Sequence, residues 1–205
     1  MAFSRRSPAR RGTRPHRRPR LRFEALEDRR LLSVVPDGPE FLVNTFTTDG
    51  QYNPSVATDV DGDFVVAWQS FGQEHLSGIY AQRYNAGGVA LGSEFQVNTT
   101  ETDQQLDPSV AMDADGDFVV VWTSEPFLAA GQDGDGDGVY AQRYNAAGVA
   151  QGSEFRVNTY TIGDQNDATV AMDADGDFVV VWTSVAQENG FDVYAQRYNA
   201  AGMPQ

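Results

Sequence analysis

The chain has 205 residues, contains no Cys and no Lys, and carries a formal net charge of −14 at pH 7. The absence of Cys excludes disulfides and thiolate chemistry. Residues 1–30 hold 11 of the 15 Arg and three acids, whereas the rest holds four Arg and 26 acids, which gives net charges of +8 and −22. An acidic body of this kind repels nucleic acid and attracts divalent cations. No apolar run approaches the roughly 18 residues of a transmembrane helix, so composition indicates no nucleic-acid partner and no membrane span.

Residues 1–37 form a basic N-terminal arm that is dense in Arg, Pro and Ser. A segment of this composition cannot bury a core, so we expect the arm to be disordered. Its only apolar run, Leu31 to Val35, is shorter than the apolar region of a secretory signal peptide. Three interpretations follow: an export signal, a solvated tail, or an Arg cluster that binds nucleic-acid phosphates. The acidic body argues against the third.

Part of this arm resembles a known export motif. The segment FEALEDRRLLS at 23–33 is similar to the LEPR-XLL motif, which occurs near the start of long repetitive proteins of planctomycetes and other Gram-negative bacteria. The resemblance implies export, and therefore an extracellular or cell-surface location. The matching residues are Leu26, Glu27, Arg29, Leu31 and Leu32, and Asp28 stands where the motif has Pro.

Three segments recur along the remainder of the chain. The first is EFLVNT, EFQVNT or EFRVNT, the second is DVDGDFVVAW or DADGDFVVVW, and the third is YAQRYN in every copy. Self-similarity at a regular period indicates a repeat architecture. The repeats are residues 38–91, 92–151 and 152–205, which have 54, 60 and 54 residues.

Each repeat contains four runs typical of short β-strands, separated by turn residues. The EFxVNT run comes first and a PSVAT-like run second, and an Asp-Gly pair then predicts a hairpin. The third run, FVVVW or FVVAW, is apolar on both faces, which is typical of a strand sandwiched between layers. The fourth run is YAQRYN. Its Arg could bind an anionic ligand but is more simply explained by pairing with an Asp of the repeat (Arg83, Arg143 and Arg197).

The predicted fold is all-β, with three four-stranded blades of the propeller type after the disordered arm. Four antiparallel strands with buried middle strands describe a propeller blade. Three blades are fewer than the four to eight that close a ring, so a terminal blade would expose apolar side chains. Either the chain is a fragment of a longer array, which we favour, or copies self-associate through open blade edges.

The repeat resembles one that is common in giant secreted bacterial proteins, many of them of the RTX, haemolysin-type calcium-binding kind. The resemblance covers residues 38–205, and it implies a non-catalytic exported or cell-surface scaffold or binding module. The partner of such a module would be a surface polymer or protein whose identity the sequence does not give. The chain lacks the glycine-rich nonapeptides of RTX proteins, so the resemblance alone does not imply calcium binding.

Two patterns of Asp are candidate sites for weakly bound Ca²⁺, which prefers six to eight oxygen ligands. One is Asp-x-Asp-Gly-Asp in every repeat, where the alternative is a plain hairpin turn with solvated carboxylates. The other is GQDGDGDG at 131–138, which matches the first half of an EF-hand loop but has Tyr144 in place of the final Glu. The candidate ligands are Asp59, Asp61 and Asp63; Asp113, Asp115 and Asp117; Asp173, Asp175 and Asp177; and Asp133, Asp135 and Asp137.

No residue pattern points to one catalytic site, so we expect that the protein is not an enzyme. His75 is the one His of the body, which excludes a multi-His zinc site, and no nucleophile elbow accompanies it. The alternative is a fragment of a carbohydrate-active, sialidase-like propeller hydrolase, since paired carboxylates suit glycoside hydrolysis. Against it, Trp68 comes six positions after Gly62, where the sialidase Asp-box has three.

Overall fold

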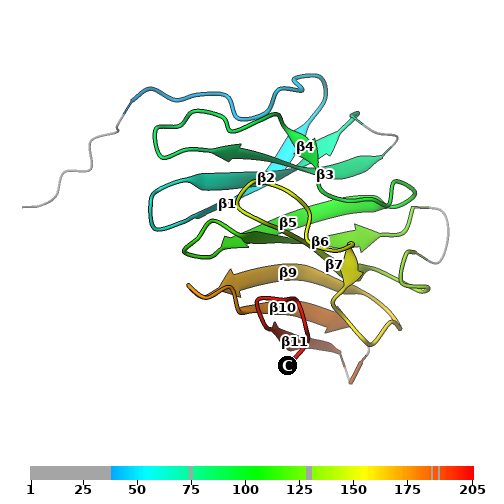
Figure 1. The fold of residues 1–205 in the computed structure, drawn as a ribbon. Coiled ribbons are helices and arrows are strands. Elements are labelled where there is room, and N and C mark those ends of the chain that lie inside the picture. Colours follow the sequence, from blue (N-terminus) through cyan, green and yellow to red (C-terminus); the bar gives the residue numbers. More distant parts are fainter. Residues whose placement is uncertain (1–37, 74–75, 128–130, 186, 189) are drawn as a thin grey trace, which may run out of the picture. The chain divides into compact units, whose positions relative to one another are not determined.

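The computed structural model describes residues 38–73, 76–127, 131–185, 187–188 and 190–205. The chain divides into two units after Glu40, and the second unit is Phe41–Gln205. The predicted disorder of the arm, its export motif and His75 lie outside the described residues. All described strands belong to the second unit (Figure 1).

The second unit consists of three antiparallel sheets in which the strand order follows the chain (Figure 1). This confirms the all-β prediction of propeller-type blades, although only two of the sheets have four strands. No described residue is helical, so no helix there is long and apolar enough to cross a membrane. The first sheet contains β1 (Gln51–Thr58), β2 (Phe64–Phe71), β3 (Ser77–Tyr84) and β4 (Phe95–Gln96); the second contains β5 (Gln104–Met112), β6 (Phe118–Glu125), β7 (Gly138–Tyr144) and β8 (Phe155–Arg156); the third contains β9 (Gln165–Met172), β10 (Phe178–Val185) and β11 (Phe191–Tyr198).

The outer strand of each four-stranded sheet comes from the following repeat. The EFQVNT segment does not open the sheet of its own repeat; its strand β4 pairs with β3, with Gln96 opposite Tyr80. In the same way β8 pairs with β7. These strands have two residues because the next N–H of the partner strand, that of Ile79, is taken by the Asn98 side chain, at 2.7 Å. The first copy, EFLVNT, forms no strand.

The Asp-Gly pairs form the predicted hairpins, but the loops are longer than two residues. Between β1 and β2 the chain turns over residues 59–63, and Gly62 has φ of 88°. Such a positive φ favours Gly because it has no Cβ. The Asp59 carboxylate accepts the N–H groups of Asp61 and Asp63, at 2.9 and 3.0 Å, which closes the loop.

The core consists of two clusters of buried side chains, one between each pair of successive sheets. Strand β6 contributes to both, with Phe118 and Trp122 on one face and Val119 and Val121 on the other. The prediction that the FVVVW run is sandwiched between layers is therefore confirmed for this strand. The Trp122 indole N–H is satisfied inside the core by the Gln105 side chain, at 2.7 Å.

The first strands of the three sheets, β1, β5 and β9, lie side by side and form the inner edge of the unit. Each contains a β-bulge at the same place, where the register of its pairing shifts. The bulge residues are Asn53, Asp107 and Asp167, with φ of 51°, 51° and 53°. Asn and Asp tolerate this left-handed conformation better than other residues with a Cβ. The bulges therefore bring one polar side chain from each sheet to the inner edge.

Candidate functional site

The three bulge residues form a polar column across the sheets. The Asn53 amide nitrogen donates to Asp107 Oδ1 at 2.5 Å and to Gln69 Oε1 at 3.2 Å. Asp167 lies near enough to Asp107 for its charge to act on that carboxyl. The column thus contains two neighbouring carboxylates and a fixed amide.

The pKa of Asp107 is raised above its usual value. Partial burial is the main cause, the negative charge of Asp167 adds to it, and the hydrogen bond from Asn53 opposes it. Asp107 therefore binds a proton more readily than an ordinary Asp and has a second carboxylate beside it. Carboxyl pairs whose environments separate their proton affinities can serve as general acid and general base.

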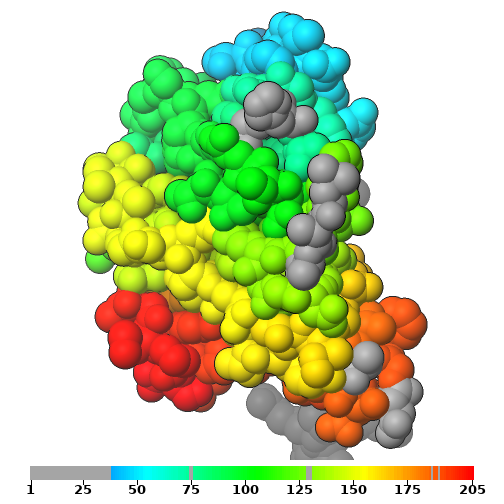
Figure 2. All heavy atoms as spheres, turned by 90° about the vertical axis from the view of Figure 1, so that its right-hand side faces the viewer, coloured from blue at the N-terminus to red at the C-terminus, as the bar shows by residue number. Residues whose placement is uncertain are grey.

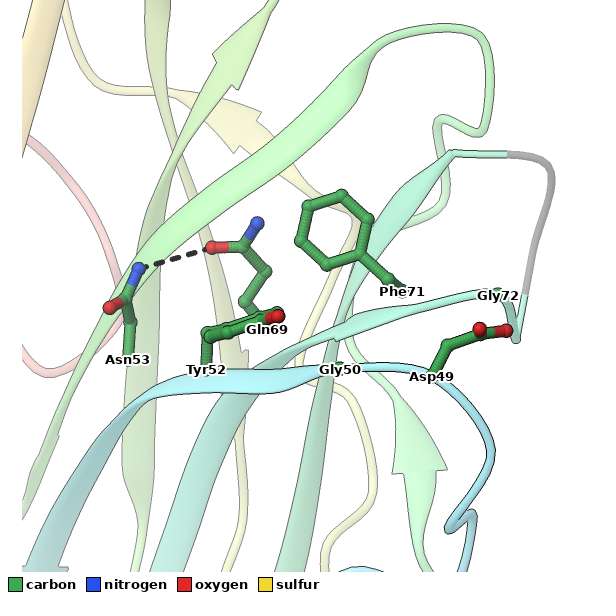
Figure 3. A pocket seen from close by; sticks show the side chains of 7 residues that line it. All are labelled: Asp49, Gly50, Tyr52, Asn53, Gln69, Phe71 and Gly72. Atoms are coloured by element: carbon green, nitrogen blue, oxygen red, sulfur yellow. Dashed lines mark hydrogen bonds between the residues drawn. The ribbon is translucent and has the colours of Figure 1, made fainter.

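A hollow of about 670 Å³ adjoins the column at Asn53 (Figure 3). The aromatic rings of Tyr52 and Phe71 line the hollow, with their centroids 5.6 Å apart and their planes at 85°. A few polar groups between apolar surfaces are typical of small-molecule sites. The residues that line it are Asp49, Gly50, Tyr52, Asn53, Gln69, Phe71 and Gly72.

Gly72 leaves the space that the Asp49 side chain occupies at the rim of the hollow. Its φ is 76°, and a Cβ on this residue would lie 2.1 Å from a carboxylate oxygen of Asp49. A side chain at position 72 would therefore push Asp49 away from the rim. The hollow thus combines aromatic surface, an amide and a carboxylate, as small-molecule sites do.

The Asp residues predicted at the hairpins are engaged with backbone groups. Asp113 and Asp173, like Asp59, accept two N–H groups of their own loop. The last Asp of each pattern accepts an N–H from the turn after YAQRYN, at 2.8 to 2.9 Å. The middle Asp of each is exposed. The nine predicted ligands therefore lie in three separate loops. The last Asp of the pattern is Asp63, Asp117 or Asp177, and the middle Asp is Asp61, Asp115 or Asp175.

The predicted loop site at 131–138 contacts the start of β9 and the segment before it. Asp135 accepts the Gly163 N–H at 2.9 Å, and the Asp137 carboxylate accepts from the Asn166 amide at 3.2 Å. Asp133 accepts the Asp135 N–H at 3.2 Å. Within the described ranges no three acidic or His side chains are grouped as a metal ion would require, so calcium binding stays a prediction.

Burial raises the pKa of Asp137 to about 6, and the nearby charges of Asp164, Glu125 and Asp133 add to the shift against the hydrogen bond from Asn166. The sequence pattern did not include Asp164 or Glu125 in this cluster. They lie outside the Asp-x-Asp motif: Glu125 ends β6, which precedes the loop, and Asp164 lies directly before β9.

Within the described part of the chain, the repeated Arg residues do not form the expected ion pairs with Asp. Arg83 donates to the Ala147 carbonyl, and Arg143 donates to the Ala201 carbonyl at 2.8 Å and to that of Ala200. In each case the acceptor belongs to the turn after YAQRYN in the next repeat. The physical reason is that this turn offers unpaired carbonyls, whereas the Asp carboxylates already accept backbone N–H groups.

Sequence reasoning missed the polar column entirely. The only local sign was an Asn or Asp before Pro54 and Pro108, at the start of the second predicted strand. Such dipeptides are usually read as turns. Only the register of the sheets shows that they are bulges on neighbouring strands.

No family model matches the chain, and no curated protein matches it in sequence. Several solved structures share its fold. An endo-arabinase from Bacteroides thetaiotaomicron is 16% identical with a TM-score of 0.46, over 71% of this chain and 55% of that one. A Hadza microbial sialidase is 12% identical with a TM-score of 0.45, over 75% of this chain and 34% of that one.

A family 117 glycoside hydrolase of the marine bacterium Zobellia galactanivorans is 10% identical with a TM-score of 0.45, over 76% of this chain and 54% of that one. The chain therefore spans about half or less of the length of these proteins. At these identities the likeness extends to the fold alone.

The matches correct the expectation that the protein is not an enzyme. The three structures named above are an endo-arabinase, a sialidase and a glycoside hydrolase, which contradicts that expectation, although TM-scores below 0.5 assign no activity to this chain. The expectation rested on the lack of a singular catalytic motif in the sequence. In a repeat fold, equivalent positions of two repeats, such as Asp107 and Asp167, can place their carboxylates together without any local signature.

Proposed function

We propose that the protein is part of a glycoside hydrolase that acts on a carbohydrate polymer at the inner edge of its sheets. The observation that carries this proposal is the Asp107 carboxyl, which has a raised pKa and a second carboxylate beside it. Asp107 also accepts a hydrogen bond from Asn53, whose side chain lines the hollow together with two aromatic rings. Glycoside hydrolysis needs two carboxyl groups of unequal proton affinity and a surface for the sugar ring.

In this proposal Asp107 is the general acid. Its proton passes to the glycosidic oxygen as the bond from that oxygen to the anomeric carbon breaks. The Asp167 carboxylate stabilises the positive charge that develops on the sugar. Water then adds its hydroxyl to the anomeric carbon and gives its other proton to the Asp107 carboxylate, which restores the acid. Asn53 orients Asp107 through its hydrogen bond, and Tyr52 and Phe71 hold the neighbouring sugar unit.

The test is hydrolysis of a panel of chromogenic aryl glycosides by the full chain and by Asp107→Asn. Loss of the general acid is expected to lower kcat/KM by about 10²- to 10⁴-fold. The matched control is Asp115→Asn, at an exposed hairpin position on the same sheet, which should leave activity unchanged. Release of no aryl group by the unmodified chain, or equal activity of Asp107→Asn, would show that the proposal is wrong.

We further infer from the LEPR-XLL resemblance that the protein acts outside the cell or at its surface, where a carbohydrate polymer would be accessible. Deletion of residues 23–33 should then retain the protein in the cell, as measured by fractionation. Unchanged distribution of the deletion variant would mean that this segment has no part in export.

A further inference from the structure

Each EFxVNT segment inside the unit joins two sheets. Phe95 packs on Tyr144 of its own repeat, with ring centroids 5.3 Å apart, while its backbone pairs with β3 of the preceding repeat. Phe155 does the same with Tyr198 and β7. Phe41 packs on Tyr84 at 5.4 Å, but no described strand pairs with it. The segment Phe41 to Asn44 is therefore one half of such a joint.

The other half of the joint is the outer edge of β11. At the internal joints the Ile79 and Val139 N–H groups donate to Asn98 and Asn158, at 2.7 and 2.9 Å. Val193 occupies the equivalent place on β11, in the same register with β10. Among the described residues its N–H has no acceptor.

Asn44 occupies the place of Asn98 and Asn158. Its amide nitrogen is already held by the Phe46 carbonyl at 2.7 Å, as that of Asn98 is held by Thr100 at 2.9 Å. Its Oδ1, by contrast, accepts no hydrogen bond from the described part of the chain. The Asn44 Oδ1 atom is thus an acceptor without a donor, and the Val193 N–H is a donor without an acceptor, among the described residues.

The hydrogen bond from the repeated Arg to the next repeat also lacks its acceptor at the end of the series. Arg83 and Arg143 each donate to a turn of the next repeat. Arg197, the third member of the series, has no acceptor among the residues that the structure describes. The carbonyl that corresponds to those of Ala147 and Ala201 is that of Gly87, in the first repeat.

The apolar faces of the joint are bare only at the two end sheets. Val139 is fully buried, but the equivalent Val193 is 75% exposed. Val110 is 6% exposed, but the equivalent Val56 is 64% exposed. The first and third sheets lie on opposite sides of the second, because β5 contacts both β1 and β9, and the blue and red parts of the unit are at opposite ends in Figure 2. One chain therefore cannot bring the two bare faces together.

We propose that two copies of this chain join head to tail, with Phe41 to Asn44 of each forming the fourth strand of the β9–β11 sheet of the other. The occupant of each open edge is thus a second copy, because the missing groups of one end are those that the other end offers. Two copies supply six sheets, within the four to eight blades that close a propeller ring. The closed ring also brings both polar columns to one axis, where each proposed site gains the inner edge of the partner.

Light scattering of the full chain at micromolar concentration should give twice the monomer mass. Val193→Pro removes the outward N–H without breaking a bond of the monomer, so it should be monomeric and remain folded by circular dichroism. Arg197→Ala should weaken dimerisation about tenfold or more. The matched control, Arg143→Ala, breaks an internal joint and should lower the melting temperature while the protein remains a dimer.

Crosslinking tests the register of the joint. At the internal joint Tyr80 and Gln96 are cross-strand partners, and their counterparts between copies are Tyr194 and Leu42. Because the chain contains no Cys, the double variant Leu42→Cys, Tyr194→Cys should form a disulfide-linked dimer on oxidation, and neither single variant should.

A monomer at all concentrations, a ladder of ever larger species, or crosslinking by a single variant would each overturn the closed head-to-tail ring. These readouts do not depend on the proposed hydrolase activity, so either proposal can fail without the other.

Discussion

Asp107 acquires its chemistry from one unusual backbone conformation. Its φ of 51° at the bulge turns the side chain toward Asn53 and Asp167 and away from the regular alternation of β5. Partial burial, and secondarily the carboxylate of Asp167, then raise its pKa. A residue that would be an ordinary solvated Asp in a regular strand is thereby made a candidate acid.

Asp137 leads to a prediction of stability against pH. Its pKa is raised from the usual 3.8 to about 6, chiefly by burial. The folded state therefore holds the proton more tightly than the unfolded state, and the stability that this provides is lost as pH rises from about 4 to 6. In calcium-free buffer at pH 7, Asp137→Asn should raise the melting temperature by about 2–4 °C, roughly 1 kcal/mol after allowance for solvent screening. The advantage of the variant should shrink toward pH 4; an advantage independent of pH would show that titration of Asp137 is not its cause.

At the scale of the elements, the EFxVNT segment shows how a short strand can serve two sheets. Its Phe belongs to the core of one repeat, while its backbone extends the sheet of the repeat before. Asn98 and Asn158 occupy equivalent positions, and each ends the strand after two residues because its side-chain oxygen accepts the N–H that a backbone carbonyl would otherwise accept. The covalent repeats and the sheets are therefore offset along the chain.

The loop at 131–138 is the element at which calcium is predicted to act. Calcium that binds only the folded form stabilises it by about 2.7 kcal/mol at a hundredfold excess over Kd. We expect millimolar Ca²⁺ to raise the melting temperature more than Mg²⁺ does, because Mg²⁺ requires a tighter octahedron. Replacing Asp133, Asp135 and Asp137 together by Asn should remove most of that difference. Equal responses to the two ions would reduce the effect to charge screening.

At the scale of the whole molecule, equivalent residues differ according to the sheet that covers them. Val120 is fully buried between the first and second sheets, whereas Val66, at the same place in the first sheet, is only partly covered. The proposed ring would cover Val66 in the same way. Apolar burial thus depends on neighbouring sheets rather than on the repeat itself.

This dependence can be measured with a matched pair of substitutions. In the monomeric Val193→Pro background, Val120→Ala should lower stability by about 2 kcal/mol, and Val66→Ala by clearly less. In the chain without Val193→Pro, the two costs should become similar because the ring buries both side chains. Thermal melts of the four variants check this, and a Val66 cost that does not change between backgrounds would argue against the ring.

The all-β class, the three repeats, the hairpins at Asp-Gly and the buried FVVVW strand can all be predicted from the amino-acid sequence. These features are local: turn chemistry and alternation along a strand are encoded within a few residues. The tertiary structure alone decided that EFQVNT completes the preceding sheet, that Arg83 and Arg143 bind carbonyls of the next repeat, and that Asn53, Asp107 and Asp167 meet at the inner edge. Such contacts join residues about one repeat apart, and their existence depends on strand register and sheet stacking, which no short stretch of sequence specifies.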